Sequence, residues 1–456
     1  MARHSGGDDR LHVLIIGAGT GGMCLAHGLR NAGISVAVYE RDKTRADGLH
    51  GYRVGISPTG ARSLRECLSP ELFDTFVATC ARPPRHFNVY TEKLGRVASF
   101  EIEPPEDPGQ AEHSVSRMTL RQVLLSDMDD VVEYGKTFTR YEQTPDGRVT
   151  AHFADGTTAT GDLLVAADGT NSPVRRQFLP DAVVRDSGVI AIAAKAPSTP
   201  ENRALVPEVA LNGISTFFAP KGQFMILHSM EFPWDHDGKV KDGVGGNDAE
   251  LIARWPGLLY DNTRDYLNWG LSASAGKFPA DVMNLRGPEL MRVALDMTGA
   301  WHADVRELMR RSDPASCFAV RIRTSEPVEA WQPGNVTLLG DAIHTMTPGM
   351  GVGANTALRD ATLLTRELVA VAEGGKKLTE AVGDYEAEML PYGTARVADS
   401  LAQNGMSGSD PLHRPFIGRI VLAVARTFFR ANDKIPALRR RFIAGLREYR
   451  GSDAEA

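Results

Sequence analysis

The sequence predicts an α/β protein with a Rossmann-like dinucleotide-binding domain, a second domain rich in β-sheet, and a C-terminal helical segment. Three observations predict this fold class. Residues 11–40 read as a strand, a glycine-rich turn, a helix and a second strand, which is the βαβ unit of such domains. Strand-like runs such as GVIAIAAKA and GISTFFAPKGQFMILHSM recur in residues 181–320. Residues 396–456 combine aliphatic stripes with many arginines at helical spacing.

The first element is the stretch VLIIGAGTGG at residues 13–22, where four apolar residues run into the pattern G-x-G-x-x-G. Helix formers follow from Thr20 to Ala32, and Gly33 is a helix stop. Glycines permit a tight turn, and the N-terminus of the helix presents free N–H groups to a pyrophosphate. The candidate pyrophosphate-binding residues are the glycines of the pattern, Gly17, Gly19 and Gly22.

The second strand, ISVAVYE, ends at Glu40, about 20 residues beyond the glycine turn. A carboxylate at this place accepts hydrogen bonds from the ribose hydroxyls of an adenosine. The same charge repels a 2′-phosphate, which disfavours NADP as the resident dinucleotide and leaves NAD and FAD open. Arg41 follows directly and would soften this repulsion.

Two later motifs place an acidic residue and glycines at the ends of buried strands. GDLLVAADGTNSPVR, residues 161–175, delivers Asp168 and a glycine at such an end. LLGDAIHTMTPGMGVGANTALRDA, residues 338–361, delivers Asp341 and then a glycine-rich run that enters a helix. Asp341 can accept from a ribityl or ribose hydroxyl, and the N–H groups of the run can face a flavin oxygen or a phosphate.

Bulk composition excludes several other classes. The net charge of -6 gives no reason to expect nucleic acid as the main partner. The four cysteines are scattered without a C-x-x-C pair, so neither a zinc site nor a redox dithiol is expected and no metal is assigned. The first ten residues lack the apolar core of a signal peptide, and no apolar run is long enough to span a bilayer. A cytoplasmic location is therefore expected.

The three motifs, in this order and at these separations, resemble the single-component, class A FAD monooxygenases of the p-hydroxybenzoate hydroxylase type. The resemblance covers roughly residues 11–180 and 320–395. Residues 181–320 resemble the family only in their recurring strand-like runs. It implies a GR2-type FAD-binding domain, FAD as the resident cofactor, NADPH or NADH as a transient co-substrate, and O2. Because no second nicotinamide-binding motif is present, the sequence does not choose between NADH and NADPH.

The resemblance assigns FAD contacts residue by residue. The segment around Arg53 is similar to the mobile loop beside the flavin, and SRMTLRQVL places Arg117 near the pyrophosphate or ribityl chain, with Arg121 as the fallback. Asp168 would contact both FAD and NAD(P)H, whereas Asp341 would bind the ribityl chain. The full set of expected cofactor-binding residues is Gly17, Gly19, Gly22, Glu40, Arg41, Arg53, Arg117, Asp168, Asp341, Gly351, Gly353, Ala354 and Asn355.

The resemblance also implies the chemistry: a flavin C4a-hydroperoxide hydroxylates an aromatic or polyketide-like small molecule, an activity typical of secondary metabolism. No side chain has to act as a nucleophile, and no catalytic residue is assigned. Many relatives carry an arginine in the strand after residue 188, but this chain has AIAAKA there, so no arginine is carried over. At His228, a histidine whose hydrogen bonds are made within the sheet is favoured over a catalytic base. Substrate contacts are expected from two strands: Phe224, Ile226, His228, Tyr266 and Asn268.

Alternative functions stay open at this point. The same fold supports alkene epoxidation, Baeyer–Villiger oxidation and isoprenoid reduction, whereas halogenation is disfavoured because no W-x-W-x-I-P signature is present. A non-enzymatic prenyl-protein binding module of the Rab-escort type shares G-x-G-x-x-G, but the late glycine loop argues against it.

The expected domain organisation is interleaved. The C-terminal helices are expected to pack on the body with their arginines facing water, and contact with a membrane surface is the less favoured interpretation. The polar loop at residues 233–250 is expected to be a disordered surface loop, and the oligomeric state is not predicted. The expected segments are 11–75, 111–180 and 321–395 for the FAD-binding domain, 76–110 for an excursion to the substrate domain, 181–320 for that domain, and 396–456 for the C-terminal helices.

Overall fold

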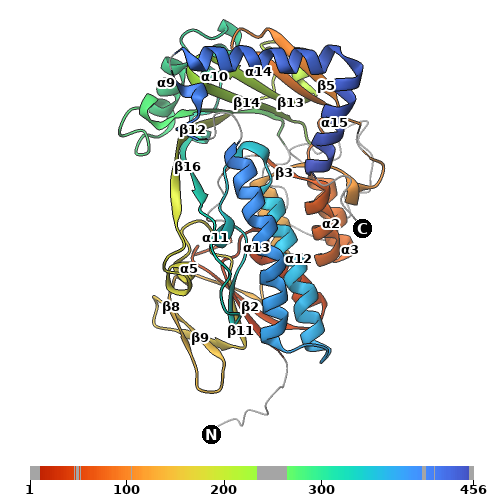
Figure 1. Ribbon diagram of the computed structural model, residues 1–456, viewed down its shortest axis with the longest axis vertical. Coiled ribbons are helices and arrows are strands. Elements are labelled where there is room, and N and C mark those ends of the chain that lie inside the picture. Colours follow the sequence, from red (N-terminus) through yellow and green to blue (C-terminus); the bar gives the residue numbers. More distant parts are fainter. Residues whose placement is uncertain are drawn as a thin grey trace.

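The computed structural model describes residues 11–45, 47, 51, 53–103, 105–233, 264–402, 407–414 and 416–450. Two sheets lie one above the other along the long axis of the molecule (Figure 1). The chain runs between them repeatedly, so that each sheet contains strands from distant parts of the sequence. The polar loop expected to be disordered lies outside the described residues from residue 234 onward.

The nucleotide-binding half is built on a five-stranded sheet with the order β17-β11-β1-β2-β7. Every neighbouring pair in this sheet is parallel, and Ile15 of β1 pairs with Val165 of β11, which in turn pairs with Thr337 of β17. The strands are short and almost wholly apolar because helices cover both faces of a parallel sheet. Their bounds are β1 His12–Ile16, β2 Ser35–Glu40, β7 Val132–Tyr134, β11 Leu163–Ala166 and β17 Val336–Leu338.

Two helices that pack closely together cover this sheet. A Cβ atom added at Gly21 of α1 would lie 2.4 Å from Leu339 Cδ2, and one at Gly28 would lie 2.6 Å from Thr365 Oγ1. These glycines therefore let α1 approach α12 and the strand β17. The helices of this half are α1 Thr20–Asn31, α2 Pro58–Cys67, α3 Pro70–Thr79, α4 Arg117–Leu124, α5 Pro173–Phe178, α11 Asp341–His344, α12 Gly353–Ala372 and α13 Leu378–Ala402.

The second half is built on a seven-stranded sheet with the order β16-β12-β15-β14-β13-β4-β5. Side chains alternate between its faces, and Met225, Leu227 and Trp269 belong to a core on one face that also includes Leu290 and Leu308 of the helices α9 and α10. The bounds are β4 His86–Thr91, β5 Arg96–Glu101, β12 Val184–Pro197, β13 Gly213–Ala219, β14 Gln223–Met230, β15 Tyr266–Ser274, β16 Phe318–Ser325, α6 Pro200–Arg203, α7 Glu208–Leu211, α9 Gly287–Met297 and α10 Ala303–Arg310.

Small elements complete the described chain. The ribbon β3–β6 joins the two halves, and β8, β9 and β10 form a three-stranded sheet beside the nucleotide-binding half. Their bounds are β3 Arg53–Ile56, β6 His113–Ser116, β8 Phe138–Gln143, β9 Val149–Phe153 and β10 Thr158–Gly161, with short 3-10 turns at Pro108–Gln110, Pro220–Gly222, Ala275–Lys277, Pro314–Ser316, Pro348–Met350 and Pro411–His413.

Three expected domain boundaries fall inside regular elements. Residue 75 lies within α3, residue 320 within β16, and residue 395 within α13, which continues to Ala402. The pattern of apolar residues does not break at these places, because each helix or strand continues across the expected boundary. The excursion at 76–110 contributes β4 and β5 to the edge of the seven-stranded sheet.

The C-terminal segment forms two helices, α14 Ile417–Lys434 and α15 Pro436–Arg450. Figure 1 shows both of them on the outside of the seven-stranded sheet. Arg419 and Arg430 of α14 are exposed, in line with the expectation that arginines of these helices face water. In addition, large apolar side chains such as Ile420 (66% exposed) and Val424 (64%) face outward, which was not expected. Within the described part of the chain, none of the helices combines the length and apolar character needed to cross a membrane.

Candidate active site

The glycine turn after β1 leaves no room for side chains. Gly17 has φ +106°, and a Cβ atom there would lie 2.5 Å from the carbonyl oxygen of Ala167. A Cβ atom at Gly22 would lie 2.3 Å from the carbonyl oxygen of Gly17. The N-cap of α1, Gly19, provides no side-chain cap, so the first N–H groups of the helix are open to a ligand. This geometry forms a cradle for an anionic group.

Glu40 closes that cradle from β2. Its carboxylate is buried and accepts from the Ala18 N–H at 2.8 Å and from the Asp42 N–H at 3.0 Å. Each oxygen retains capacity for a further hydrogen bond, as a ribose hydroxyl would require. Arg41, in contrast, is exposed. Glu40 thus stabilises the turn before any ligand is present.

The residues after β11 and β17 meet the glycine turn at one edge, because the three neighbouring strands are parallel. Asp168 Oδ2 accepts from the Val174 N–H at 3.3 Å, while Oδ1 is buried without a hydrogen-bond partner among the described residues. Burial raises the pKa of Asp168. An anionic acceptor with an unused buried oxygen is suited to a hydroxyl donor of a ligand.

Asp341 opens α11 directly after β17. It is exposed to solvent, yet desolvation by the surrounding protein raises its pKa, against the opposing charges of His344 and Arg117. A Cβ atom added at Gly51 would lie 3.0 Å from Arg117 Cδ, so Gly51 packs against that side chain. The charge of Arg117, on α4, thus acts on Asp341, on α11.

Arg121, the alternative to Arg117 as an expected FAD contact, forms an ion pair within the protein. Its Nη2 lies 3.0 Å from Asp42 Oδ2, just beyond the end of β2. This ion pair fixes α4 against the strand that carries Glu40.

The glycine loop that precedes α12 is open at its N–H groups. Gly351 adopts φ +62°, and α12 begins at Gly353 without a side-chain cap at its N-cap. The first backbone hydrogen bond of the helix is the one from the Thr356 N–H to the Val352 carbonyl, at 2.9 Å. The N–H groups of Gly353, Ala354 and Asn355 thus precede the first intrahelical donor.

The side chain of Asn355 has a structural task. Its Oδ1 accepts from the Ser57 N–H at 2.8 Å, and its Nδ2 donates to the Gly55 carbonyl at 2.9 Å. Asn355 therefore clamps the end of β3 to the glycine loop. Because the amide group of Asn355 is engaged in this clamp, a contact between that side chain and a flavin is disfavoured. The backbone N–H of Asn355 is still open to a ligand.

Two buried residues that the sequence analysis missed hold the cradle together. Arg175 donates to the carbonyls of Ala342 at 2.7 Å and Thr170 at 2.9 Å, which ties the middle motif to the late one. Asp360 accepts from the Gly340 N–H at 2.8 Å and lies 2.6 Å from His344 Nε2. Both residues lie inside the quoted motifs, and the signal that could have found them was a charged residue at a buried helix position.

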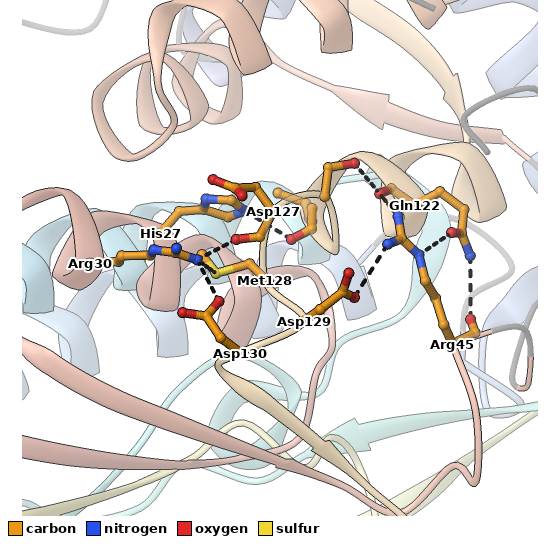
Figure 2. Close-up of polar contacts among 10 residues, drawn as sticks. His27, Arg30, Arg45, Gln122, Asp127, Met128, Asp129 and Asp130 are labelled. Carbon is orange, nitrogen blue, oxygen red and sulfur yellow. Dashed lines mark hydrogen bonds and ion pairs between the residues drawn. The ribbon is translucent and has the colours of Figure 1, made fainter. Parts of the chain in front are cut away.

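Figure 2 shows how Arg45, in the segment after β2, contacts Gln122 of α4 and Asp129 in the loop that follows α4. Arg45 donates to the side chain of Gln122 at 2.7 Å, and Arg30 at the end of α1 pairs with Asp130 at 3.0 Å. His27 of α1 donates to the Leu124 carbonyl at 2.8 Å. Burial lowers the pKa of His27 to about 4, so this histidine is neutral at physiological pH.

One face of the seven-stranded sheet carries polar side chains in a row. His228 of β14 is directly opposite Asn268 of β15, which is directly opposite Lys195 of β12. Directly opposed residues of antiparallel strands point to the same face, so the three side chains share it with Ile226. This face is opposite to the one covered by α9 and α10, and it is named the site face below.

Arg53 of β3 connects the site face to the cofactor edge. Its Nε donates to Ser114 Oγ at 2.8 Å, and its Nη2 lies 3.5 Å from Glu112 Oε1. Burial and the charge of Arg53 hold the pKa of His228 well below its usual range. Arg53 is therefore close to His228, while the same strand is clamped to the glycine loop by Asn355.

His228 and Asn268 are buried but incompletely hydrogen bonded. His228 is 6% exposed and Asn268 is also 6% exposed, and neither His228 Nδ1 nor Asn268 Oδ1 has a partner among the described residues. The expectation of a satisfied sheet histidine at position 228 is therefore wrong. The sequence could not show this, because it depends on which side chains of neighbouring strands face His228.

Lys195 is the basic residue of the AIAAKA strand, and the sequence analysis did not assign it to the site. Its Nζ lies 4.5 Å from the centre of the Tyr266 ring, a cation–π contact. Tyr266 also packs against Phe232, with ring centres 5.8 Å apart. Phe224 lies farther along the site face and packs against Phe218 at 5.2 Å. The expected substrate residues thus share one face but spread over its length.

Comparison with known proteins adds an independent finding. A family model described as FAD binding domain matches residues 10–238 and 301–400 of this chain. The match contains the glycine turn, the middle motif, the late motif and the site-face residues His228 and Lys195.

The chain is also similar to curated and solved proteins. It is 30% identical over 406 residues to the dual O-methyltransferase/FAD-dependent monooxygenase CTB3 of Cercospora beticola, which covers 85% of this chain and 45% of that protein. The chain therefore spans about half of the length of this relative. A crystal structure of a candidate FAD containing monooxygenase from Photorhabdus luminescens is 31% identical, with a TM-score of 0.74, covering 87% of this chain and 98% of that one. HpxO of Klebsiella pneumoniae, solved with FAD and uric acid, is 25% identical, with a TM-score of 0.73 and 97% coverage of both chains.

Proposed function

Since the chain belongs to the family of FAD binding domains, we propose that it is a FAD-dependent monooxygenase that hydroxylates an aromatic or polyketide-like small molecule. NADPH or NADH would be the electron donor and O2 the second co-substrate. The activities named for CTB3 and for the Photorhabdus protein support this class, and the uric acid bound to HpxO supports a planar substrate.

The observation that carries the proposal is the connection through β3 between the cofactor edge and the site face. Asn355 clamps Gly55 to the glycine loop at 2.9 Å, and Arg53 lies two residues earlier on the same strand, where its charge, after burial, contributes to lowering the pKa of His228. Groups suited to hold a cofactor and groups suited to hold a substrate therefore adjoin one another. A dinucleotide-binding protein without a second substrate would not need unpaired polar groups on that sheet face.

The residues present fit FAD. The cradle at Gly17 and Gly22 excludes side chains, the N-termini of α1 and α12 lack side-chain caps, and Asp168 Oδ1 is buried without a partner among the described residues. In this proposal the pyrophosphate lies on the N-terminus of α1, and a ribose hydroxyl binds Glu40. Arg117 and Asp341 face the ribityl chain, and the N–H groups of Gly353 and Ala354 face the flavin ring. Bound FAD would supply electron transfer from NAD(P)H and the activation of O2.

The chain's own residues would bind and orient the substrate. Ile226 and Phe224 offer apolar contact. His228 Nδ1 and Asn268 Oδ1, which have no partner among the described residues, offer hydrogen bonds to a ligand. The positive charges of Lys195 and Arg53 favour an ionised phenol or enol over its neutral form, and they raise the electron density of the ring that is attacked. Burial keeps His228 neutral, so it accepts or donates a hydrogen bond without adding charge.

Oxygen incorporation tests the proposal directly. The purified chain is expected to bind FAD and to oxidise NADPH or NADH faster when a matching phenol, quinone or polyketide is added, with one atom of labelled O2 appearing in the product. Epoxide or ester products would redirect the assignment to alkene epoxidation or Baeyer–Villiger oxidation. Failure to bind FAD would contradict the proposal altogether. The expected cytoplasmic location stays a prediction.

Replacement of Lys195 by Met tests the substrate side. Losing a charged hydrogen bond or ion pair to the substrate is expected to lower kcat/KM by roughly 10- to 100-fold, with FAD affinity unchanged. Lys195→Arg should restore part of the loss because it keeps the charge. If Lys195→Met left kcat/KM unchanged for every active substrate, the assignment of Lys195 to the site would be wrong.

A further inference from the structure

The outward face of α14 carries a continuous apolar stripe. Ile417, Ile420, Val424 and Phe428 follow one another at intervals of three and four residues, so they lie along one side of the helix. They are between 47% and 66% exposed, and Phe416, just before the helix, is 79% exposed. Single exposed apolar residues are ordinary, but a row of large ones marks an interaction surface.

The inner face of the same helix is firmly packed. Phe429 lies 5.7 Å from Phe218 of β13, and Phe442 of α15 lies 4.5 Å from Phe100 of β5. The Ser99 N–H donates to Asp433 at 3.2 Å. The helix is therefore held to the seven-stranded sheet by one face, and the stripe is a second face that the described residues do not cover.

Basic side chains flank the stripe. Residues 416–450 contain nine Lys or Arg and two acidic residues, whereas the whole chain has a net charge of -6. Arg426 is tied down by Glu92 at 2.6 Å. Arg419 and Arg430 form no ion pair with any described residue.

These arginines line an open hollow beside α14. Its volume is about 540 Å³, and its walls include Pro220, Leu422, Thr427 and three arginines at one side of the helix, Arg419, Arg426 and Arg430. Arg426 is engaged by Glu92, which leaves the guanidinium groups of Arg419 and Arg430 for phosphate oxygens, which arginine binds in pairs of hydrogen bonds.

We propose that the C-terminal helices dock on an anionic membrane surface, with the stripe of α14 in the headgroup–acyl boundary and Arg419 and Arg430 on lipid phosphates. Apolar residues beside arginines on one surface-exposed helix are the signature of an interfacial amphipathic helix. A second copy of the chain fits less well, because a two-fold interface brings the same cationic surfaces together. Nucleic acid does not explain an exposed row of Ile, Val and Phe.

The surface is continuous with the wall of the site. Phe224 of the site face contacts Phe218, which contacts Phe429, which contacts the exposed Phe428 at 5.6 Å. A protein docked in this way would hold this end of the substrate sheet at the lipid. The inference itself does not depend on the monooxygenase activity.

Vesicle flotation with the full chain tests the inference. We expect binding to vesicles of phosphatidylglycerol mixed with phosphatidylcholine, and weaker binding to pure phosphatidylcholine or at high salt. Arg419→Gln combined with Arg430→Gln should weaken binding by about tenfold or more. Ile420→Ser combined with Val424→Ser and Phe428→Ser should abolish flotation even though all charges are kept.

Matched controls separate docking from folding. Arg140→Gln with Arg185→Gln removes the same charge from exposed arginines paired with Glu142 and Glu326 elsewhere, and Val183→Ser removes another exposed apolar residue. Both control variants should float like the parent chain, and every variant should keep its FAD absorbance. Two results would overturn the inference: no flotation of the parent chain on anionic vesicles, or a dimer in analytical ultracentrifugation that the stripe variant dissociates.

Discussion

The cofactor edge and the site face differ in how their polar groups are satisfied. At the cofactor edge Glu40 accepts two backbone N–H groups, and buried Asp360 accepts from Gly340 while it pairs with His344. On the site face, His228 and Asn268 keep buried atoms without partners among the described residues. Both regions are buried to a similar degree, so burial alone does not explain the difference.

The contrast indicates which region is organised before its ligand arrives. At the cofactor edge, the satisfied carboxylates of Glu40 and Asp360 and the close contacts at Gly17 and Gly22 are made within the protein. Asp168 Oδ1 is the exception among these carboxylates, because it is buried without a partner among the described residues. Unsatisfied groups on the site face cost free energy in the absence of a ligand, and that cost is tolerated where a ligand supplies the missing bonds. Stability and ligand binding should therefore respond in opposite ways to substitutions in the two regions.

The largest expected effect is at the glycine turn. Gly17→Ala places a Cβ atom 2.5 Å from the Ala167 carbonyl oxygen at φ +106°, so we expect more than about 3 kcal/mol of lost stability and loss of FAD. Chemical denaturation and flavin content measure both. Gly33→Ala is the control, since its φ is +74° but nothing lies within 4 Å; it should cost about 1 kcal/mol and keep FAD. Equal costs for the two variants would mean that the close contact at the cradle is unimportant.

Acid pH tests the nucleotide-binding half through His27 of α1. Its folded pKa of about 4 is below the unfolded value of 6.5, so the unfolded state takes up the proton first. The stabilising contribution is complete above pH 6.5 and is lost as pH falls toward 4, a change of about 3 kcal/mol in total. His27→Gln, which keeps a donor for Leu124, should flatten the dependence of unfolding free energy on pH in this window. Identical slopes for parent and variant would show that His27 is not protected from protonation.

Glu40→Ala is expected to weaken FAD binding by roughly 1.5–3 kcal/mol, the cost of a lost hydrogen bond to a charged group. It should also destabilise the chain without FAD, because the N–H groups of Ala18 and Asp42 lose their acceptor. FAD titration by fluorescence quenching and denaturation of the FAD-free chain measure the two effects separately. Normal FAD affinity in the variant would remove Glu40 from the proposed ribose site.

The smallest expected effect has the opposite sign. Asn268→Leu removes a buried acceptor that has no partner among the described residues, so we expect the FAD-bound chain to gain roughly 1 kcal/mol of stability and to lose about tenfold in kcat/KM. Thr337→Val is the matched control, because its hydroxyl donates to Glu386 at 2.7 Å, and it should lose stability and keep activity. If both variants lost stability equally, the contrast between the two regions would not hold.

Sequence reasoning predicted the cofactor edge well because its signals are local. The turn at Gly17, the strand end at Glu40 and the strand end at Asp341 each follow from a short motif whose backbone geometry is nearly fixed. The α/β class, and the family that the FAD binding domain match supports, were predicted from the same three motifs. The roles of individual residues toward FAD remain predictions that the substitutions above test.

The site face was harder to predict because its neighbours are set by strand pairing. Lys195, Asn268 and His228 come together through two antiparallel registers, and a shift of one residue would turn any of them to the other face. The same limit applied to α14, where helical spacing identified an apolar stripe but not the side of the helix that the sheet would cover. Arg175 and Asp360 were missed because the partners of these buried charged side chains, the Ala342 carbonyl and His344, are brought to them by the fold.

The strand order of the parallel sheet has a consequence for synthesis on the ribosome. Ile15 pairs with Val165, and Val165 pairs with Thr337, so the glycine turn has its full set of neighbours only after most of the chain has emerged. Such non-local pairing makes folding slow and exposes unpaired strand edges in the meantime. The nascent N-terminal βαβ unit would therefore depend on chaperones for longer than its compact motif suggests. The expected FAD site includes residues as late as Asn355, so FAD would bind only chains in which the distant strands have paired. Binding would then stabilise the correctly folded chains.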